Sequence, residues 1–182
     1  MNNQVIEYIQ GKYKEKYISQ DCRHILKKFS SKSTKDLFRV NEIAFVLHIL
    51  GQDDDAVAIC DLLDDIYFDG DYTLWEVVEE VRLLKARILR SRGEKNDAAL
   101  IIENIMIHEH PDLWMNQKKC IPLYEENAET ARTYSSKVGE FGWKIMKYRI
   151  LIKFNELPSF PIDKIATEKE ILSLGDELRG ML

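Results

Sequence analysis

One ten-residue segment of the chain returns 42 residues later with the same layout. Residues 47–56 read LHILGQDDDA, and residues 89–98 read LRSRGEKNDA. Each copy ends an apolar stretch at a glycine (Gly51 or Gly93), crosses four polar residues and restarts on an alanine. Glycine adopts a positive φ at little cost and is therefore common just after the end of a helix. Two such copies predict two hairpins, each made of two helices joined by a tight turn.

The spacing of apolar residues predicts helices along the rest of the chain as well. Residues 43–50 are apolar nearly all round, which is typical of a helix in the middle of a domain. Alternation of the strand type is absent from the sequence. A chain of 182 residues is long enough for one well-packed domain. We therefore predict a single all-α domain over 1–182, with N-terminal helices in 1–36, the two hairpins in 37–108 and further helices in 112–182.

The helices after the second hairpin have weaker boundary signals. We expect a helix from about 123 to 137, a turn at Gly139 and Gly142, and a helix that ends near Asn155. Thr167 and Glu170 have the spacing of a capping box. The last short helix is therefore expected to begin at Thr167.

Residues 37–66 and 79–108 resemble tetratricopeptide repeats. The usual period of that family is 34 residues, so the longer period here implies an insertion, which falls near residues 69–73. The resemblance covers about a third of the chain, and it implies antiparallel helical hairpins stacked as a short array. It is carried by the small and bulky residues of the first helices, by the turn glycines and by the alanines of the second helices: Ala44 and Ala86, Leu47 and Leu89, Gly51 and Gly93, Ala56 and Ala98.

The resemblance also implies a concave groove, lined by the first helix of each hairpin, that binds a peptide or a partner helix. Arg87 and Arg90 are one turn apart and could take a carboxylate or an acidic peptide. Alternatively, an N-terminal helix within 5–29 fills the groove and covers its apolar residues. The candidate partner-binding residues are Asn41, Phe45, His48, Leu83, Arg87 and Arg90; the other groove-facing positions are Phe38, Ile49, Glu80 and Ser91.

Charge is distributed unevenly along the sequence. The net charge is +5 in residues 1–39, −12 in residues 40–81, which contain no Lys or Arg, and +2 in the remainder. The basic N-terminal stretch has acids interleaved, and the isoelectric point is about 5.5. We therefore interpret that stretch as a solvated helix face and predict no nucleic-acid partner. The acidic segment favours a basic protein partner.

Few residue patterns point to chemistry. Residues 65–76 overlay a calcium-binding EF-hand loop, but Tyr67 replaces a carboxylate ligand, so an acidic inter-helix loop is favoured. His108 and His110 are two apart and do not share a helical face. Motifs for a serine or cysteine nucleophile or a phosphate-binding loop are absent. We predict no catalytic residue, no metal and no cofactor.

The start of the sequence has no signal-peptide pattern, and its longest apolar run is too short for a membrane span. Cys22, Cys60 and Cys120 are widely spaced and suit a reducing compartment, so we predict a cytoplasmic protein. Our first hypothesis is a non-enzymatic module that binds a protein or peptide. The alternatives are an acidic antagonist of a basic partner, of the immunity or antitoxin type, and a small enzyme with an unrecognised site.

Overall fold

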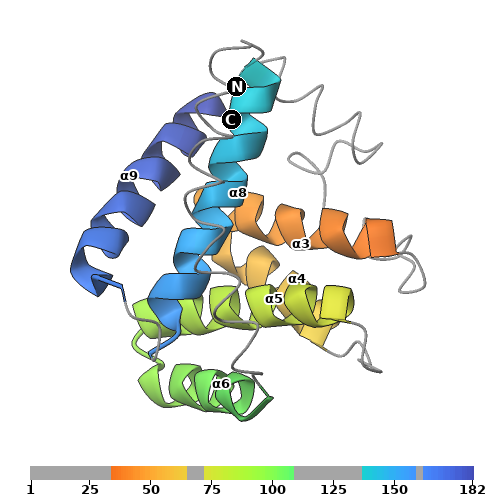
Figure 1. Cartoon of the computed structure of the whole chain (residues 1–182), viewed down its shortest axis with the longest axis vertical. Helices are drawn as coiled ribbons and strands as arrows, with labels where there is room; N and C mark the ends of the chain where they lie inside the picture. Colours follow the sequence, from red (N-terminus) through yellow and green to blue (C-terminus); the bar gives the residue numbers. More distant parts are fainter. Residues whose placement is uncertain (1–33, 65–71, 109–136, 159–161) are drawn as a thin grey trace.

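A computed structural model of the chain describes residues 34–64, 72–108, 137–158 and 162–182 (Figure 1). These residues form six α-helices and contain no strand. The predicted all-α class is therefore confirmed for this part of the chain. The helices are α3 (Thr34–Ile49), α4 (Asp53–Asp64), α5 (Tyr72–Ser91), α6 (Lys95–His108), α8 (Lys137–Glu156) and α9 (Lys164–Met181).

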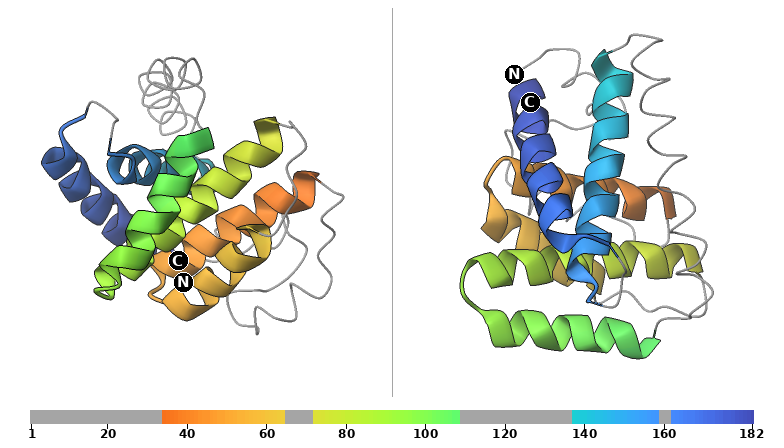
Figure 2. Two further views of the ribbon diagram at one scale, coloured as in Figure 1. Left: turned by 90° about the horizontal axis from the view of Figure 1, so that it is seen from below. Right: turned by 60° about the vertical axis from the view of Figure 1, so that its left-hand side comes forward.

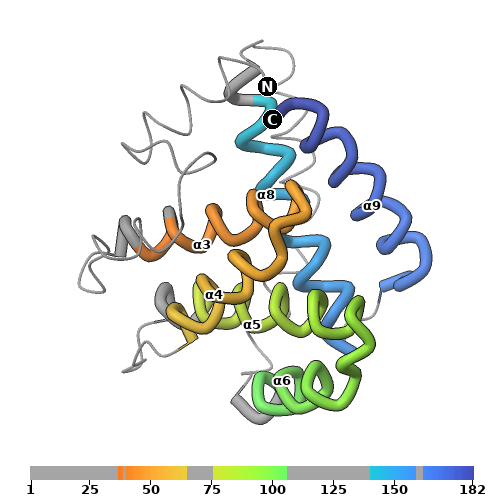
Figure 3. Tube along the Cα trace, turned by 180° about the vertical axis from the view of Figure 1, so that it is seen from behind, coloured from red at the N-terminus to blue at the C-terminus, as the bar shows by residue number. Residues whose placement is uncertain are grey.

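The first four of the described helices form two antiparallel pairs. Helix α3 packs against α4, α5 packs against α6, and α4 also packs against α5. Seen from behind, α3, α4, α5 and α6 follow one another down the molecule (Figure 3). An ion pair between Lys85 and Asp61 (2.5 Å) joins α5 to α4 across the boundary between the two pairs.

The two predicted turns have the same hydrogen bonds. In the first, Gly51 has a φ of +77°, its N–H donates to the carbonyl of His48 and the N–H of Gln52 donates to the carbonyl of Leu47. In the second, Gly93 has a φ of +87°. Its N–H donates to the carbonyl of Arg90, and the N–H of Glu94 donates to the carbonyl of Leu89. This pair of bonds defines a Schellman motif, which satisfies carbonyl groups at the end of a helix. The sequence repeat thus marks two equivalent helix ends.

The small residues of the repeat lie where helices approach each other. Ala44, Ala56, Ala86 and Ala98 are all buried. Helix α3 is buried on nearly every side from Ile43 to Leu47, as its apolar sequence predicted. Its burial needs covering elements beyond the hairpin partner α4.

The cover comes from the two C-terminal helices. Figure 2 shows α8 and α9 side by side, crossing the direction of α5 and α6. Helix α8 packs on α5, and α9 packs on α8 and on α3. Apolar residues of α3, α4, α5, α8 and α9 share the main core, and a smaller cluster joins α5, α6 and the end of α8.

Two predicted boundaries are wrong. Helix α8 runs through Gly139 and Gly142, where a turn was expected. Each glycine costs a helix interior about 1 kcal/mol, but Phe141, Ile145 and Ile152 recur on one face of α8 and are all buried in the main core. Tertiary burial therefore outweighs the local preference.

The capping box at Thr167 is the second error. Helix α9 begins three residues earlier, because Asp163 caps it: its Oδ1 accepts hydrogen bonds from the backbone N–H groups of Ile165 and Ala166, both at 3.0 Å. Thr167 consequently lies inside the helix.

Some predicted features lie outside the described residues. They are the N-terminal helices, most of the expected helix over 123–137, the first seven residues of the EF-hand-like loop, and His110. Within the described part, no helix is both long and apolar enough to cross a membrane.

Candidate functional site

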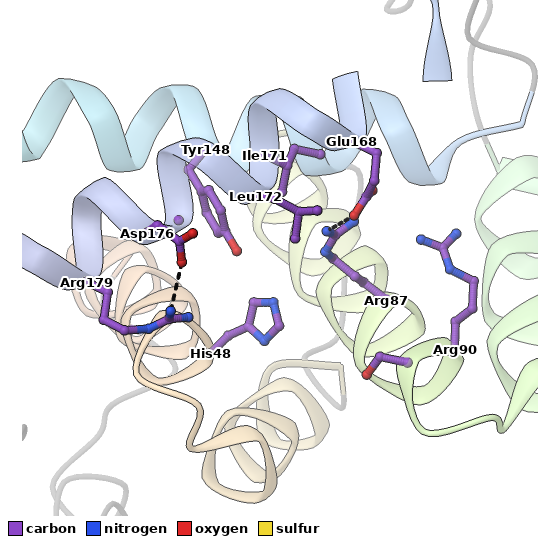
Figure 4. Close-up of a pocket in the computed structure, with 11 residues that line it drawn as sticks. His48, Arg87, Arg90, Tyr148, Glu168, Ile171, Leu172, Asp176 and Arg179 are labelled. Carbon is purple, nitrogen blue, oxygen red and sulfur yellow. Dashed lines mark hydrogen bonds and ion pairs between the residues drawn. The ribbon is translucent and has the colours of Figure 1, made fainter. Parts of the chain in front are cut away.

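A cavity of about 380 Å³ lies where the C-terminal helices cross the ends of α3 and α5 (Figure 4). Helix α3 contributes one residue, α5 three, α8 one and α9 six. Its polar groups come from all four helices, and its apolar wall comes from α9. The lining residues are His48, Arg87, Arg90, Ser91, Tyr148, Glu168, Ile171, Leu172, Gly175, Asp176 and Arg179.

Arg87 is the centre of an ionic network that ties α5 to α8 and α9. Its Nη1 donates to Glu156 Oε1 (3.0 Å) and to Glu168 Oε2 (2.8 Å), and its Nη2 donates to Glu168 Oε1 (2.5 Å). The pairing with Glu168 is bidentate, which is the strongest arrangement for a guanidinium and a carboxylate. The hydrogen bond from Arg87 lowers the pKa of Glu168. Arg87 therefore holds α9 against the end of the second hairpin.

Arg90 belongs to the same network but is more exposed. Its Nη2 donates to Glu156 Oε1 at 2.7 Å, while 44% of its side chain remains accessible to solvent. The side chain of Glu156 is fully buried. Burial raises the pKa of Glu156 in spite of the two guanidinium groups beside it.

A third arginine, Arg179, lies at the other side of the cavity (Figure 4). Its Nε donates to the backbone carbonyl of Ile49 at 2.8 Å, and its Nη1 donates to Asp176 at 2.9 Å. The first bond joins α9 to the end of α3, so Arg179 also fixes the position of α9.

His48 and Tyr148 lie between the arginines. His48 Nδ1 is 2.7 Å from Asp53 Oδ1, a contact that spans the first hairpin turn. Burial lowers the pKa of His48. The two rings are 6.5 Å apart between centroids. The Tyr148 ring is buried, and burial raises the pKa of its hydroxyl to about 12, so the hydroxyl keeps its proton at neutral pH.

The six predicted partner-binding residues divide into two groups. His48, Arg87 and Arg90 line the cavity. Asn41, Phe45 and Leu83 have no exposed surface. The predicted groove is therefore closed at the three buried residues and open at the three that line the cavity.

Helix α8 accounts for this burial. Asn41 donates to Glu80 Oε2 (2.6 Å), which also accepts from Arg149 of α8 (2.5 Å). The same Arg149 guanidinium lies 5.7 Å from the centre of the Phe45 ring. Leu83 packs with Phe154 near the end of α8. The expected cover was an N-terminal helix, which lies outside the described residues.

The remaining groove positions follow the same division. Ser91 lines the cavity, whereas Ile49 and Glu80 are buried. Phe38 is half-buried against the main core. The C-terminal contributors Tyr148, Glu168 and Arg179 were missed, because no motif connects them to the repeat and they reach it only through tertiary packing.

A hydrolase-type site is incompletely assembled. Asp53 and His48 have the contact that orients a general base, and Ser91 lines the same cavity. The Ser91 hydroxyl, however, donates to the carbonyl of Ile88 at 2.7 Å, and no hydrogen bond joins it to His48. In the described part of the chain, no three His, Cys, Asp or Glu side chains are grouped to hold a metal ion.

Most of the described acids of the segment over 40–81 are either buried or paired with a basic side chain. Glu42, Glu79 and Glu80 are buried. Four of its other acids pair with basic side chains: Asp53 with His48, Asp54 with Arg92, Asp61 with Lys85 and Asp64 with Arg82. Part of the negative charge that was expected to attract a basic partner is therefore paired within the chain.

Comparison with known proteins yields a family. The chain matches the family described as "Family of unknown function (DUF6707)" over residues 2–159, a span that includes α3 to α8 and stops before α9. No curated protein matches the chain, and no solved structure does. Because the match extends over most of its length, the chain belongs to the DUF6707 family.

Proposed function

We propose that the chain is a non-catalytic protein-binding module that takes a short segment of a partner protein into the cavity beside α9. The observation that carries the proposal is the convergence of His48, Arg87 and Arg90 on one cavity. The resemblance to tetratricopeptide repeats predicts that these residues face a partner, and they come from the first helices of both pairs. In this proposal α3–α6 form a short tetratricopeptide-like array, and α8 and α9 cover most of its inner face and leave the cavity beside α9 open.

The size and lining of the cavity favour a peptide segment. A volume of about 380 Å³ falls within the range of roughly 300–1,000 Å³ that is usual for ligand pockets. It can take one or two side chains but no folded surface. Ile171 and Leu172 offer apolar contact, and the arginines offer directed hydrogen bonds.

The two alternatives have less support. The antagonist hypothesis needs a broad acidic face, and most of the described acids over 40–81 are buried or paired within the chain. A hydrolase of the serine type needs a nucleophile in contact with its base, and the Ser91 hydroxyl donates to the carbonyl of Ile88 instead of bonding to His48. We retain the cytoplasm as the proposed location, on the scattered cysteines alone.

An array of short peptides tests the proposal. Peptides of equal length and graded charge are probed with the purified full chain and with Arg90→Gln. We expect the chain to retain a subset enriched in acidic residues, and Arg90→Gln to weaken that binding about tenfold, since a hydrogen bond to a charged group contributes roughly 1.5–3 kcal/mol.

Arg92→Gln is the matched control. Arg92 follows α5 directly and carries the same charge, but it pairs with the exposed Asp54 and does not line the cavity. Binding by this variant should equal that of the unaltered chain. Retention of no peptide at all, or equal losses in both variants, would contradict the proposal.

A further inference from the structure

Among the described residues, two of the three large apolar side chains that stay exposed lie on α9. Ile165 is 73% exposed and Leu172 is 58% exposed, while the third, Leu100, lies on α6. Ile165 and Leu172 are two helical turns apart and therefore lie on the same side of α9. Figures 1 and 2 show α9 at the edge of the molecule. This side of α9 is therefore accessible to another protein.

Charged side chains lie in the same row. Positions 165, 169, 172, 176 and 179 follow in steps of four and three residues, the spacing that keeps side chains on one seam of a coiled coil. We call these residues, Ile165, Lys169, Leu172, Asp176 and Arg179, the α9 stripe. The row thus alternates apolar and charged side chains over the first four positions.

The charged groups of the α9 stripe are open to new partners. Lys169 is exposed, and no residue that the structure describes forms an ion pair with it. Asp176 pairs with Arg179 within the helix at 2.9 Å, but their side chains are 75% and 55% exposed. An exposed pair of this kind contributes little to stability. Asp176 can therefore accept a second cation at little cost.

The α9 stripe is complementary to a second copy of itself in the opposite direction. About a two-fold axis at Leu172, that residue faces its own copy. Lys169 lies three residues before Leu172 and Asp176 four residues after it, so each faces the other across the axis, and the symmetry forms this pair of opposite charges twice. Ile165 and Arg179, each seven residues from Leu172, also face each other, and the methylene stem of an arginine can cover an apolar side chain.

A parallel arrangement of two copies lacks this complementarity. It would place Lys169 against Lys169 and Asp176 against Asp176, and like charges brought together across an interface are unfavourable. The order of the charges along the α9 stripe therefore favours one partner in one orientation, an antiparallel second copy.

We propose that the α9 stripe binds a second copy of the chain, antiparallel, about a two-fold axis at Leu172. One helix against another buries less than the roughly 800 Å² per partner of a standard stable interface. The dimer is therefore expected to be weak, with a dissociation constant in the upper micromolar range. The inference goes beyond the proposed function and does not need a partner segment.

The same surface also borders the cavity. Leu172, Asp176 and Arg179 line the cavity as well as belonging to the α9 stripe. A second copy would contact these residues from the solvent side. Self-association and the binding of a partner segment should therefore compete, and this consequence alone rests on the proposed function.

Sedimentation velocity of the full chain over a series of concentrations tests the proposal. We expect the weight-average sedimentation coefficient to rise with concentration from the value of a monomer towards that of a dimer. The strongest peptide of the array should shift the chain back towards the monomer. A chain that stays monomeric at every concentration would overturn the inference, and so would a dimer that binds this peptide without dissociating.

Charge reversal shows whether the α9 stripe is the surface involved. Lys169→Asp would place two carboxylates against each other on both sides of the axis, and Asp176→Lys would do the same with two ammonium groups. Each variant alone should raise the dissociation constant about tenfold. An equimolar mixture of the two variants should associate as the unaltered chain does, because each carboxylate then faces an ammonium group. A variant that failed to fold could not regain association on mixing.

Glu103→Lys is the matched control. Glu103 is exposed on α6, and its replacement changes the net charge by the same amount as Asp176→Lys. This variant should associate as the unaltered chain does. An equal loss in the control, or a mixture that does not regain association, would overturn the inference.

The outcomes separate the two proposals. Self-association that follows the charge-reversal pattern, together with no retention of any peptide by the chain, would support the dimer and contradict the proposed partner segment. Peptide retention by a chain that stays monomeric would support the proposed function and overturn this inference.

Discussion

At the scale of single residues, Gly51 and Gly93 end α3 and α5 because each has a positive φ that other residues adopt only with strain. At the start of α9 the predicted cap Thr167 is wrong, because the side chain of Asp163 accepts from the first backbone N–H groups instead. A sequence motif identifies a residue that can cap a helix. Which of two nearby residues caps it depends on where the backbone turns into the helix, and that is set by the tertiary structure.

Replacement of Gly93 by alanine tests the backbone argument. A methyl group at this position would meet no atom within 4 Å, so any loss comes from the φ of +87° alone. We expect the free energy of unfolding to fall by about 1–2 kcal/mol. The control is Gly180→Ala, which also meets no atom but lies inside α9, where alanine is preferred. Urea denaturation measures the free energy of unfolding of both variants. Equal losses in the two variants would contradict the backbone argument.

The contribution of Glu168 should depend on pH. The hydrogen bond from Arg87 lowers its pKa below the ordinary 4.5, so its pairing stabilises the fold above pH 4.5 and is lost as the pH falls through the lowered value. We expect Glu168→Gln to cost about 1 kcal/mol at neutral pH, because the partly exposed pair is screened by solvent.

The loss of stability caused by Glu168→Gln should disappear at acidic pH. The control is Glu170→Gln, on the same helix, whose ion pair with Lys147 is more exposed and should contribute little at any pH. Denaturation curves at several pH values make the comparison. A cost of Glu168→Gln that persists unchanged in acid would count against the assigned pairing.

At the scale of elements, helix identity was predictable and helix placement was not. The apolar spacing within α3, α4, α5 and α6 located all four helices. Helix α8 crosses them and is held by buried polar pairs with α5, such as Lys153 with Glu79 and Arg149 with Glu80. These partners are 74 and 69 residues apart, and among so many charged residues no sequence pattern selects the pairs that form.

The pair between Lys153 and Glu79 tests the docking of α8. Their side chains are 5% and 4% exposed and 2.6 Å apart. Removing one partner strands a buried charge, so Lys153→Met or Glu79→Leu alone should cost about 3–5 kcal/mol, while the double variant should be near neutral. A double-mutant cycle by urea denaturation measures the coupling. Single costs below about 1 kcal/mol, as for an exposed pair, would contradict the observed position of α8.

At the scale of the whole molecule, the C-terminal helices decide which predicted residues can meet a partner. The resemblance to tetratricopeptide repeats placed Asn41, Phe45, His48, Leu83, Arg87 and Arg90 on one groove-facing side, and these residues lie on the side that α8 and α9 cover. Among the described residues, the end beside α9 is open as a cavity. That division depends on where two later helices cross, which is a property of the assembled fold and of no local pattern.

Site-specific photo-crosslinking tests the central claim, that a partner segment enters beside α9, most directly. Leu172 lines the cavity and Leu100 lies on α6, and both are 58% exposed, so they are matched in type and accessibility. Each is replaced in turn by an aliphatic diazirine amino acid, and the chain is irradiated with the strongest peptide from the array. The account predicts that the peptide is captured from position 172 and not from position 100. Capture from position 100 alone, or equally from both positions, would contradict it.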